Sequence, residues 1–171
     1  MTWRSRTATS DAQGQLVSIA RYGHFCRALE HRLGVVDPCG NADPNSSAHA
    51  VSVSIPADAF SRGKPEPILP TESNLFQRSA VEALCSRVAD AVVDTSGLPV
   101  TVATTDVAQA LATLVRVVMN IDDGDPRRAR LLAILQKHFD AARAGGATPK
   151  AALASTFTLA CSSPTSAGVG L

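Results

Sequence analysis

The sequence predicts a mainly α-helical protein: a single-domain bundle of about five helices, with an irregular middle segment that contributes a small two-stranded β-ribbon. Hydrophobic residues make up 45% of the chain but aromatic residues only 4%, so the core must be built from Ala, Val and Leu, as in closely packed helices. Apolar residues recur at helical spacing in several segments that open with capping residues. The length of 171 residues suits one domain.

The first helix is expected over residues 11–33. Ser10 followed by Gln13 resembles a capping box, and Gly34 supplies the residue that commonly follows a helix C-terminus. The preceding residues, 1–9, are expected to form a flexible N-terminal tail. Arg4 and Arg6 are not followed by an apolar stretch, so this segment is not expected to be a secretory signal as it stands. The apolar positions of this helix are Leu16, Ile19, Cys26, Leu29 and Leu33.

The segment 35–70 breaks the helical pattern with six prolines and many Asn, Ser and Asp residues. Within it, residues 49–55 alternate between apolar and polar, which is typical of a half-buried strand. A shorter alternation at 98–102 is expected to pair with that strand. The apolar side chains of the strand are the expected interaction surface, open to a partner strand: Val51, Val53 and Ile55.

The next helix is expected to begin at Thr71 or Ser73 and to end before Asp94 and Gly97. One apolar stripe runs along it at spacings of three and four residues, so this face should pack against the rest of the protein. The stripe consists of Val81, Leu84, Cys85, Val88 and Val92.

Three more helices are expected between residues 106 and 162, with Asp106, Asp125 and Thr148 as their N-caps. Proline follows the second and third of these caps, which suits the first helical position. The domain is therefore expected over 10–164, with 165–171 as a C-terminal tail. The residues expected to end these helices are Gly145, Gly146 and Pro164. Those expected on the inner faces of the last two helices are Leu131, Leu135, Phe139, Ala142, Leu153, Phe157, Ala160 and Cys161.

The four cysteines, Cys26, Cys39, Cys85 and Cys161, contain no C-x-x-C pair, which argues against a thiolate metal site. Buried thiols and structural disulfides both fit their number and their expected core positions. If they are bridged, Cys26–Cys39 and Cys85–Cys161 are favoured, although four cysteines allow three pairings. Bridged cysteines would indicate an envelope or extracellular protein, and free cysteines a cytoplasmic one.

Two polar clusters are candidate binding sites. His24 and His31 lie seven residues apart on one helix face, but about 10 Å of helix separates them, so one metal ion would need further ligands. Solvated surface histidines are the simpler interpretation. Arg127, Arg128 and Arg130 stand at a helix N-terminus, where an anion could bind. Neighbouring aspartates favour local ion pairs instead.

The charge balance of sixteen basic and fifteen acidic residues lacks the basic excess of a nucleic-acid-binding domain. No apolar stretch is long enough for a membrane span, and no nucleotide-binding, hydrolase or metalloprotease motif is present. We therefore expect a non-enzymatic structural or protein-interaction domain without a cofactor, which works through a protein partner or self-association. The alternative is a small-ligand or metal-binding helical protein, and a helical enzyme is less favoured.

Overall fold

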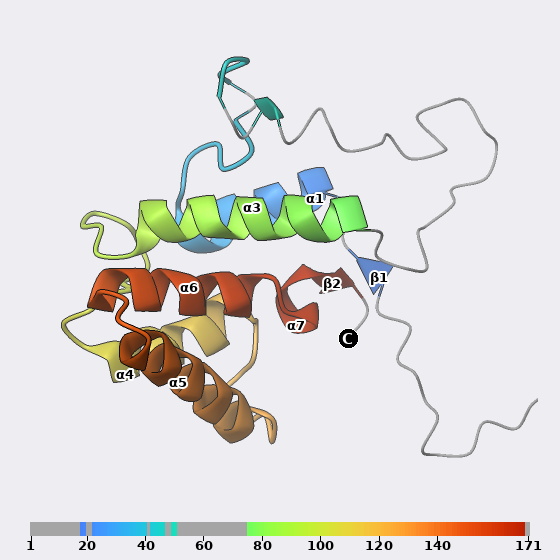
Figure 1. Cartoon of the computed structure of the whole chain (residues 1–171). Coiled ribbons are helices and arrows are strands. Elements are labelled where there is room, and N and C mark those ends of the chain that lie inside the picture. Colours follow the sequence, from blue (N-terminus) through green and yellow to red (C-terminus); the bar gives the residue numbers. More distant parts are fainter. Residues whose placement is uncertain (1–17, 20–21, 41, 47–48, 51–74, 170–171) are drawn as a thin grey trace, which may run out of the picture.

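The computed structural model describes residues 18–19, 22–40, 42–46, 49–50 and 75–169. This part of the chain is mainly helical, as the sequence predicts (Figure 1). Its elements, in chain order, are β1 (Ser18–Ile19), α1 (Tyr22–Leu33), α3 (Leu75–Val92), α4 (Val107–Thr113), the π-helix η2 (Leu114–Val118), α5 (Arg128–Ala144), α6 (Pro149–Cys161), α7 (Pro164–Ala167) and β2 (Gly168–Val169).

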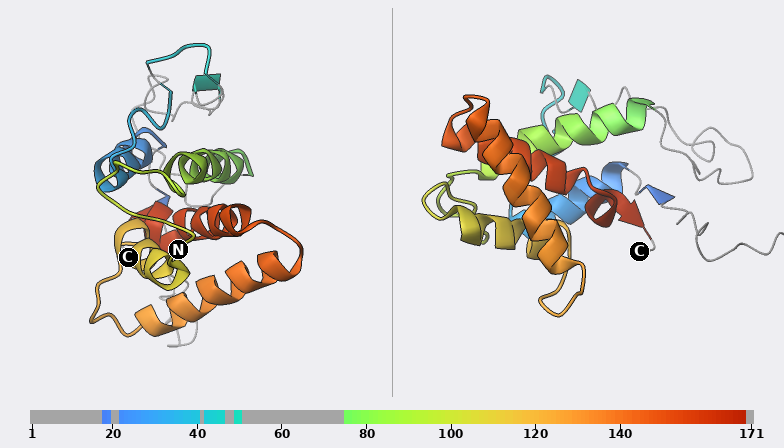
Figure 2. Two further views of the ribbon diagram at one scale, coloured as in Figure 1. Left: turned by 90° about the vertical axis from the view of Figure 1, so that its left-hand side faces the viewer. Right: turned by 60° about the horizontal axis from the view of Figure 1, so that its bottom comes forward.

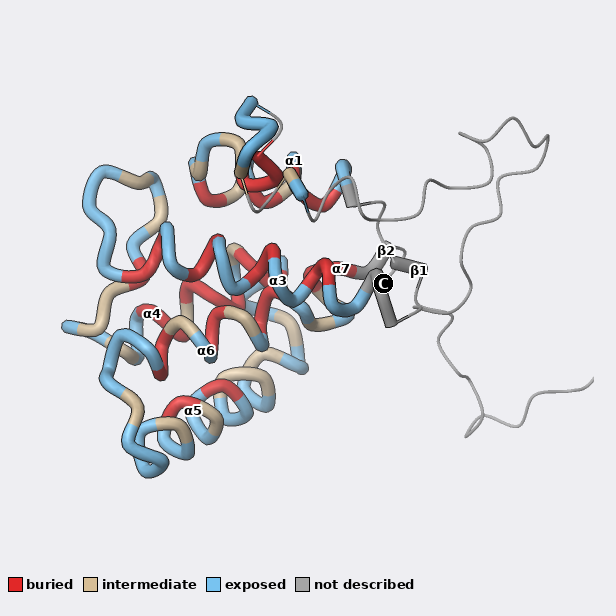
Figure 3. Tube along the Cα trace, turned by 45° about the horizontal axis from the view of Figure 1, so that its top comes forward, coloured by how far each residue is buried: buried red, intermediate tan, exposed pale blue. Residues whose placement is uncertain are grey.

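Helix α6 packs against α3 on one side and against α5 on another, and it also contacts η2 and α7 (Figures 1 and 2). The buried residues gather on the facing sides of these helices, while α5 keeps an exposed outer face (Figure 3). Every apolar position predicted for α3 is buried, as are the four predicted for α6: Leu153, Phe157, Ala160 and Cys161. The periodicity therefore identified the core faces of both helices correctly.

Side-chain caps form at two of the predicted helix starts. The Asp106 carboxylate accepts the backbone N–H of Gln109 at 3.0 Å, and the Thr148 hydroxyl accepts that of Ala151 at 3.2 Å. Each cap satisfies an N–H group that has no partner within its helix. These local interactions explain why α4 and α6 begin where they do.

Gly34 ends α1 as predicted, with its N–H donating to the Glu30 carbonyl at 2.8 Å. Its φ is +70°, and a Cβ at this position would stand 2.5 Å from Cδ of Pro99. Both the left-handed backbone and the close approach of the 95–100 segment therefore require glycine.

The first helix is shorter than predicted. It begins at Tyr22, whereas Ser18 and Ile19 form strand β1, antiparallel to β2 with Ser18 opposite Val169. Backbone pairing with a segment from the other end of the chain replaces helical hydrogen bonds at these residues. The rest of the predicted extension, 11–17 and 20–21, lies outside the described residues.

The predicted ribbon lies only partly within the described residues. His49 and Ala50 are helical, and the remainder of that predicted strand lies outside the described residues. Val102 forms a single parallel bridge with Val93 instead. The Asp94 carboxylate closes this loop by accepting the N–H of Thr104 at 2.7 Å and its hydroxyl at 3.0 Å.

Two predicted boundaries also move. Helix α5 begins at Arg128 rather than directly after Asp125, because Asp125 first closes a turn in which its carbonyl accepts the N–H of Arg128. Residues assigned to the C-terminal tail instead form α7 and β2, with Ser166 and Ala167 buried. Pro164 is the first residue of α7, a position that proline favours. The predicted N-terminal tail, 1–9, lies outside the described residues.

Helix α1 is tied to the rest of the core at η2. Arg32, on the last turn of α1, donates from Nη1 to the carbonyl oxygen of Val118 at 3.2 Å. A π-helix leaves carbonyl groups at its end that need partners from outside the helix. The arginine supplies one such partner across the helix interface.

Candidate functional site

A groove runs between α3 and α6 and is closed at one side by His138 of α5. We call it the α3–α6 groove. Its lining residues are Glu82, Ser86 and Asp90 of α3, His138 of α5, and Ala151, Ala154, Ser155, Thr158, Leu159 and Ser162 on or just after α6. Among the described residues it combines side chains from three helices in one depression.

Helical spacing explains why these residues meet. Glu82, Ser86 and Asp90 stand four residues apart and form one stripe along α3. The lining residues of α6 recur at intervals of three and four, on the face that its apolar residues leave open. The opposite sides of both helices are buried, so packing in the core holds the two polar stripes beside each other.

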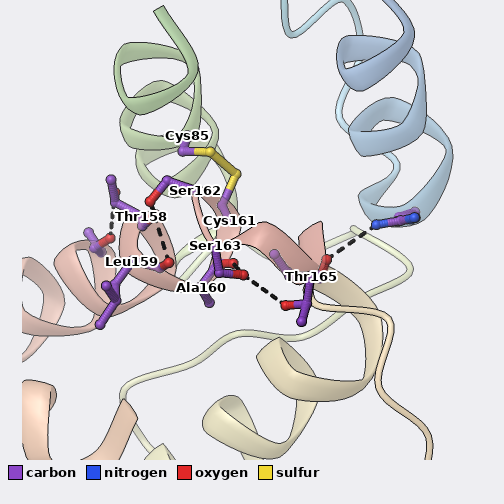
Figure 4. Close-up of a disulfide and its surroundings, with 11 residues drawn as sticks. Cys85, Thr158, Leu159, Ala160, Cys161, Ser162, Ser163 and Thr165 are labelled. Carbon is purple, nitrogen blue, oxygen red and sulfur yellow. Dashed lines mark hydrogen bonds between the residues drawn. A yellow bond between two sulfur atoms is a disulfide. The ribbon is translucent and has the colours of Figure 1, made fainter. Parts of the chain in front are cut away.

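A disulfide fixes this arrangement from inside. Cys85 and Cys161 join α3 to α6 with their Cα atoms 5.7 Å apart, and both residues are fully buried. Each cysteine directly precedes a residue that lines the groove, Ser86 on α3 and Ser162 after α6. Figure 4 shows Ser162 and Thr158 beside this disulfide. The bridge therefore limits how far the groove walls can separate.

The hydroxyl groups on the α6 side face the groove mainly as acceptors. Thr158 donates its proton to the Ala154 carbonyl at 3.0 Å, and Ser162 donates to the Thr158 carbonyl at 2.8 Å. A hydroxyl that donates within its own helix keeps its lone pairs for another partner. These hydroxyls can thus accept hydrogen bonds from a molecule in the groove.

On the α3 side, Glu82 and Asp90 are exposed, and neither makes an ion pair within the described part of the chain. They lie eight residues apart, so about 12 Å of helix axis separates their backbones. No Lys or Arg is among the lining residues. The lining residues of α3 thus include two carboxylates and no cationic side chain, while Arg78 and Arg87 stand elsewhere on the same helix.

His138 and Ser155 form the most reactive-looking pair, with Nε2 and Oγ 2.9 Å apart. A nucleophilic serine also needs a third group that orients the histidine, and N–H donors that stabilise an oxyanion. Within the described residues, no carboxylate hydrogen bonds to the other ring nitrogen of His138, and Ser155 stands inside α6, where backbone N–H groups bond along the helix. Among the described residues, this pair is therefore without the further groups that acyl transfer requires.

All four cysteines form disulfides, Cys26–Cys39 and Cys85–Cys161, which is the pairing that the sequence analysis favoured. The Cα atoms of Cys26 and Cys39 are 5.9 Å apart, and both side chains are buried. This bridge joins α1 to the loop that follows it. A depression lies beside it, lined in part by His24, Arg27 and Glu30.

His24 and His31 are both exposed on α1. Throughout the described ranges, no group of three His, Cys, Asp or Glu residues is arranged to hold a metal ion. His138 hydrogen bonds to Ser155, well separated in sequence from both α1 histidines. Among the described residues, the structure thus brings no cluster of ligands to His24 and His31.

The three arginines at the start of α5 lie beside aspartates. Arg127 pairs with Asp125 at 2.8 Å, and Arg128 pairs with Asp123 at 3.2 Å, while Arg130 is exposed. Hydrogen bonds from the side chain and backbone of Arg127 lower the pKa of the Asp125 carboxyl, and the same contact raises the pKa of Arg127. Two of these arginines are therefore engaged in local ion pairs.

The predicted interaction surface, Val51, Val53 and Ile55, lies outside the described residues. The α3–α6 groove is not among the sites predicted from the sequence. The signal was present in α6, where Ser155, Thr158 and Ser162 recur at spacings of three and four on the face opposite the apolar one.

None of the helices that the structure describes is both long and apolar enough to cross a membrane. No protein-family model, curated protein or solved structure matches this chain.

Proposed function

We propose that this chain is a non-enzymatic protein-interaction domain that binds a partner protein in the α3–α6 groove. The observation that supports this proposal is the groove itself: two helices joined by a buried disulfide present a row of polar side chains beside each other. A surface that is held rigid before binding loses less entropy when a partner docks.

The composition of the groove also favours a protein partner. Ala151 and Ala154 contribute small side chains to the α6 wall. Leu159 adds an exposed apolar side chain beside the hydroxyl groups. A mixture of apolar and hydrogen-bonding groups is typical of non-obligate protein interfaces. We further propose that the domain works in an oxidising compartment, where disulfides persist.

Photo-crosslinking tests the proposal. A photoreactive amino acid at Thr158, introduced in cells that naturally make the protein, should crosslink one partner, and mass spectrometry would identify it. A crosslinked species of twice the chain mass would identify a second copy of this chain as the partner. The same probe at Ala91, which is exposed on α3 but does not line the groove, is the control.

The affinity of two variants for the purified partner then tests whether the partner docks in the groove. Ser86 is exposed on the α3 wall, so Ser86→Trp should fill the groove and weaken binding of the purified partner by about tenfold or more. The matched substitution Ala91→Trp should leave affinity unchanged. Equal affinity of both variants, or the same crosslinks from both probe positions, would refute the groove as the binding site.

A further inference from the structure

We infer that the Cys26–Cys39 disulfide is a redox-sensitive switch. A dithiol reductant opens it while the Cys85–Cys161 disulfide stays closed, and its opening releases the loop that follows α1. Three properties of the structure support this inference: the surroundings of each bridge, the segment that must move to expose it, and the hydrogen bonds within that segment.

The two bridges differ in their surroundings. Cys85 and Cys161 are fully buried between α3 and α6, and neither lines the α3–α6 groove. The side chains of Cys26 and Cys39 are buried too, but both residues line the depression beside α1. Exchange of a disulfide requires a thiolate to reach one of its sulfur atoms. A small movement beside the depression therefore brings a reductant into contact with this bridge.

The segment that must move to expose each bridge is also different. Cys39 belongs to a surface loop in which Val36 is 86% exposed, so displacement of this loop uncovers the bridge without separating two helices. Cys85 and Cys161 lie in two packed helices, and Phe157, one turn before Cys161, is buried as well. Exposure of that bridge requires α3 to separate from α6. Openings of packed core helices cost far more free energy than openings of surface loops.

The loop after α1 is held by local hydrogen bonds. The Asp37 carbonyl accepts the N–H of Gly40 at 3.0 Å, and the Asp37 carboxylate accepts that of Ala42 at 2.8 Å. The N–H of Ser46 donates to the Asp43 carbonyl at 3.0 Å. Each of these bonds joins two residues of the loop and does not anchor the loop on α1. The loop can therefore keep them when it moves away from the helix.

The reaction is a thiol–disulfide exchange. A thiolate of the dithiol attacks Sγ of one cysteine, the S–S bond breaks, and the other cysteine leaves as a thiolate. The second thiol of the reductant then attacks the resulting mixed disulfide. Cys26 and Cys39 together gain two electrons and two protons, and the reductant is oxidised to its own disulfide.

The test treats the whole, unreduced chain with increasing concentrations of dithiothreitol. Free thiols are blocked with N-ethylmaleimide, and mass spectrometry of the digested protein quantifies the blocked fraction of each cysteine. Cys26 and Cys39 should be half reduced at a dithiothreitol concentration about tenfold or more below that required for Cys85 and Cys161. The same titration in concentrated urea is the control, because unfolding removes the difference in access.

Hydrogen exchange measures the consequence for the fold. At the reductant concentration that opens only Cys26–Cys39, amide exchange should become faster in the loop and in the first turn of α1, and should stay unchanged in α3 and α6. The Cys26→Ala, Cys39→Ala variant should show the same pattern without reductant and no further response to it. If this variant does not fold, the titration of the natural chain still tests the switch.

Either measurement can overturn the inference. Reduction of both bridges at the same concentration, or of Cys85–Cys161 first, would show that the fold does not expose the first bridge selectively. Selective reduction with unchanged exchange in the loop would show that the bridge does not control the loop. Faster exchange throughout α3 and α6 would show that its opening unfolds the domain.

Discussion

The two disulfides stabilise different kinds of structure. Cys85–Cys161 joins α3 to α6 across 76 residues, at the centre of the core. Cys26–Cys39 spans 13 residues and joins α1 only to the loop directly after it. That loop already folds through local hydrogen bonds, such as the one from the Ala42 N–H to the Asp37 carboxylate at 2.8 Å. One bridge therefore holds the tertiary arrangement, whereas the other reinforces local structure.

The α3–α6 groove depends on the region that the Cys85–Cys161 bridge holds together. Its walls belong to α3 and α6, whose relative position is tertiary and cannot be maintained by turns or caps. Helix α1 reaches the rest of the protein through packing and through the hydrogen bond from Arg32 to Val118. We therefore expect changes in the α3–α6 region to affect both stability and binding, and changes in the α1 region to affect stability alone.

Removal of the Cys85–Cys161 bridge should have the largest effect. In the chain-entropy account, a bridge that closes 76 residues stabilises the protein by about 4.5 kcal/mol, because it restricts the unfolded chain. The Cys85→Ala, Cys161→Ala variant should lose about that much free energy of unfolding in urea titrations. It should also bind the proposed partner protein more weakly.

Removal of the Cys26–Cys39 bridge should have a smaller effect, because the closed segment spans only 13 residues. The same relation gives about 3 kcal/mol. The Cys26→Ala, Cys39→Ala variant, measured under identical conditions, should keep the groove affinity of the unaltered protein. A loss of stability as large as that of the other pair would contradict the proposed difference between the two regions.

The hydrogen bond from Arg32 to Val118, which links α1 to the rest of the core, should contribute less to the free energy of unfolding than either disulfide. Arg32→Met keeps the aliphatic part of the side chain but leaves the Val118 carbonyl without this donor. We expect a loss of about 1–2 kcal/mol in the free energy of unfolding. Hydrogen exchange should show faster opening of α1 and little change in α6. Faster exchange throughout α3 and α6 would show that α1 is not a separate unit.

The smallest effect on stability should come from substitutions in the turn before α5, which contains neither disulfide. Since Arg127 lowers the pKa of the Asp125 carboxyl, the folded state favours its ionised form. This contribution is present above the ordinary aspartate pKa of about 3.9 and is lost as the pH falls through the lowered value. Thermal unfolding at a series of pH values measures it.

At neutral pH, Asp125→Asn should therefore lower the Tm slightly, and the difference from the unaltered protein should disappear in strong acid. Asp122→Asn, at an exposed position in the same turn, is the matched control for the substitution itself. A deficit for Asp125→Asn that persists in strong acid would show that the ion pair with Arg127 is not its cause.

The sequence predicted the features that depend on local chemistry. The caps at Asp106 and Thr148, the end of α1 at Gly34 and the buried stripes of α3 and α6 all follow from side chains within a few turns of each other. Each helix therefore carried its own start, stop or inner face in its sequence pattern.

The features that the sequence did not predict depend on contacts between distant segments. The pairing of β1 with β2 brings residues near position 18 beside residues near position 168, so no local pattern revealed it. The α3–α6 groove needs the relative position of two helices that are separated by more than fifty residues. Its polar stripes look like ordinary solvated faces until packing places them together.

The most direct test of this account is a disulfide map of the unreduced, alkylated protein. Cleavage after Lys and Arg places each cysteine in a different peptide, because basic residues separate all four positions. We predict that peptide 79–87 remains linked to 151–171, and peptide 22–27 to 33–62, with no alkylated cysteine. Free thiols at Cys85 and Cys161, or a link between 22–27 and either 79–87 or 151–171, would contradict the role assigned to the α3–α6 bridge.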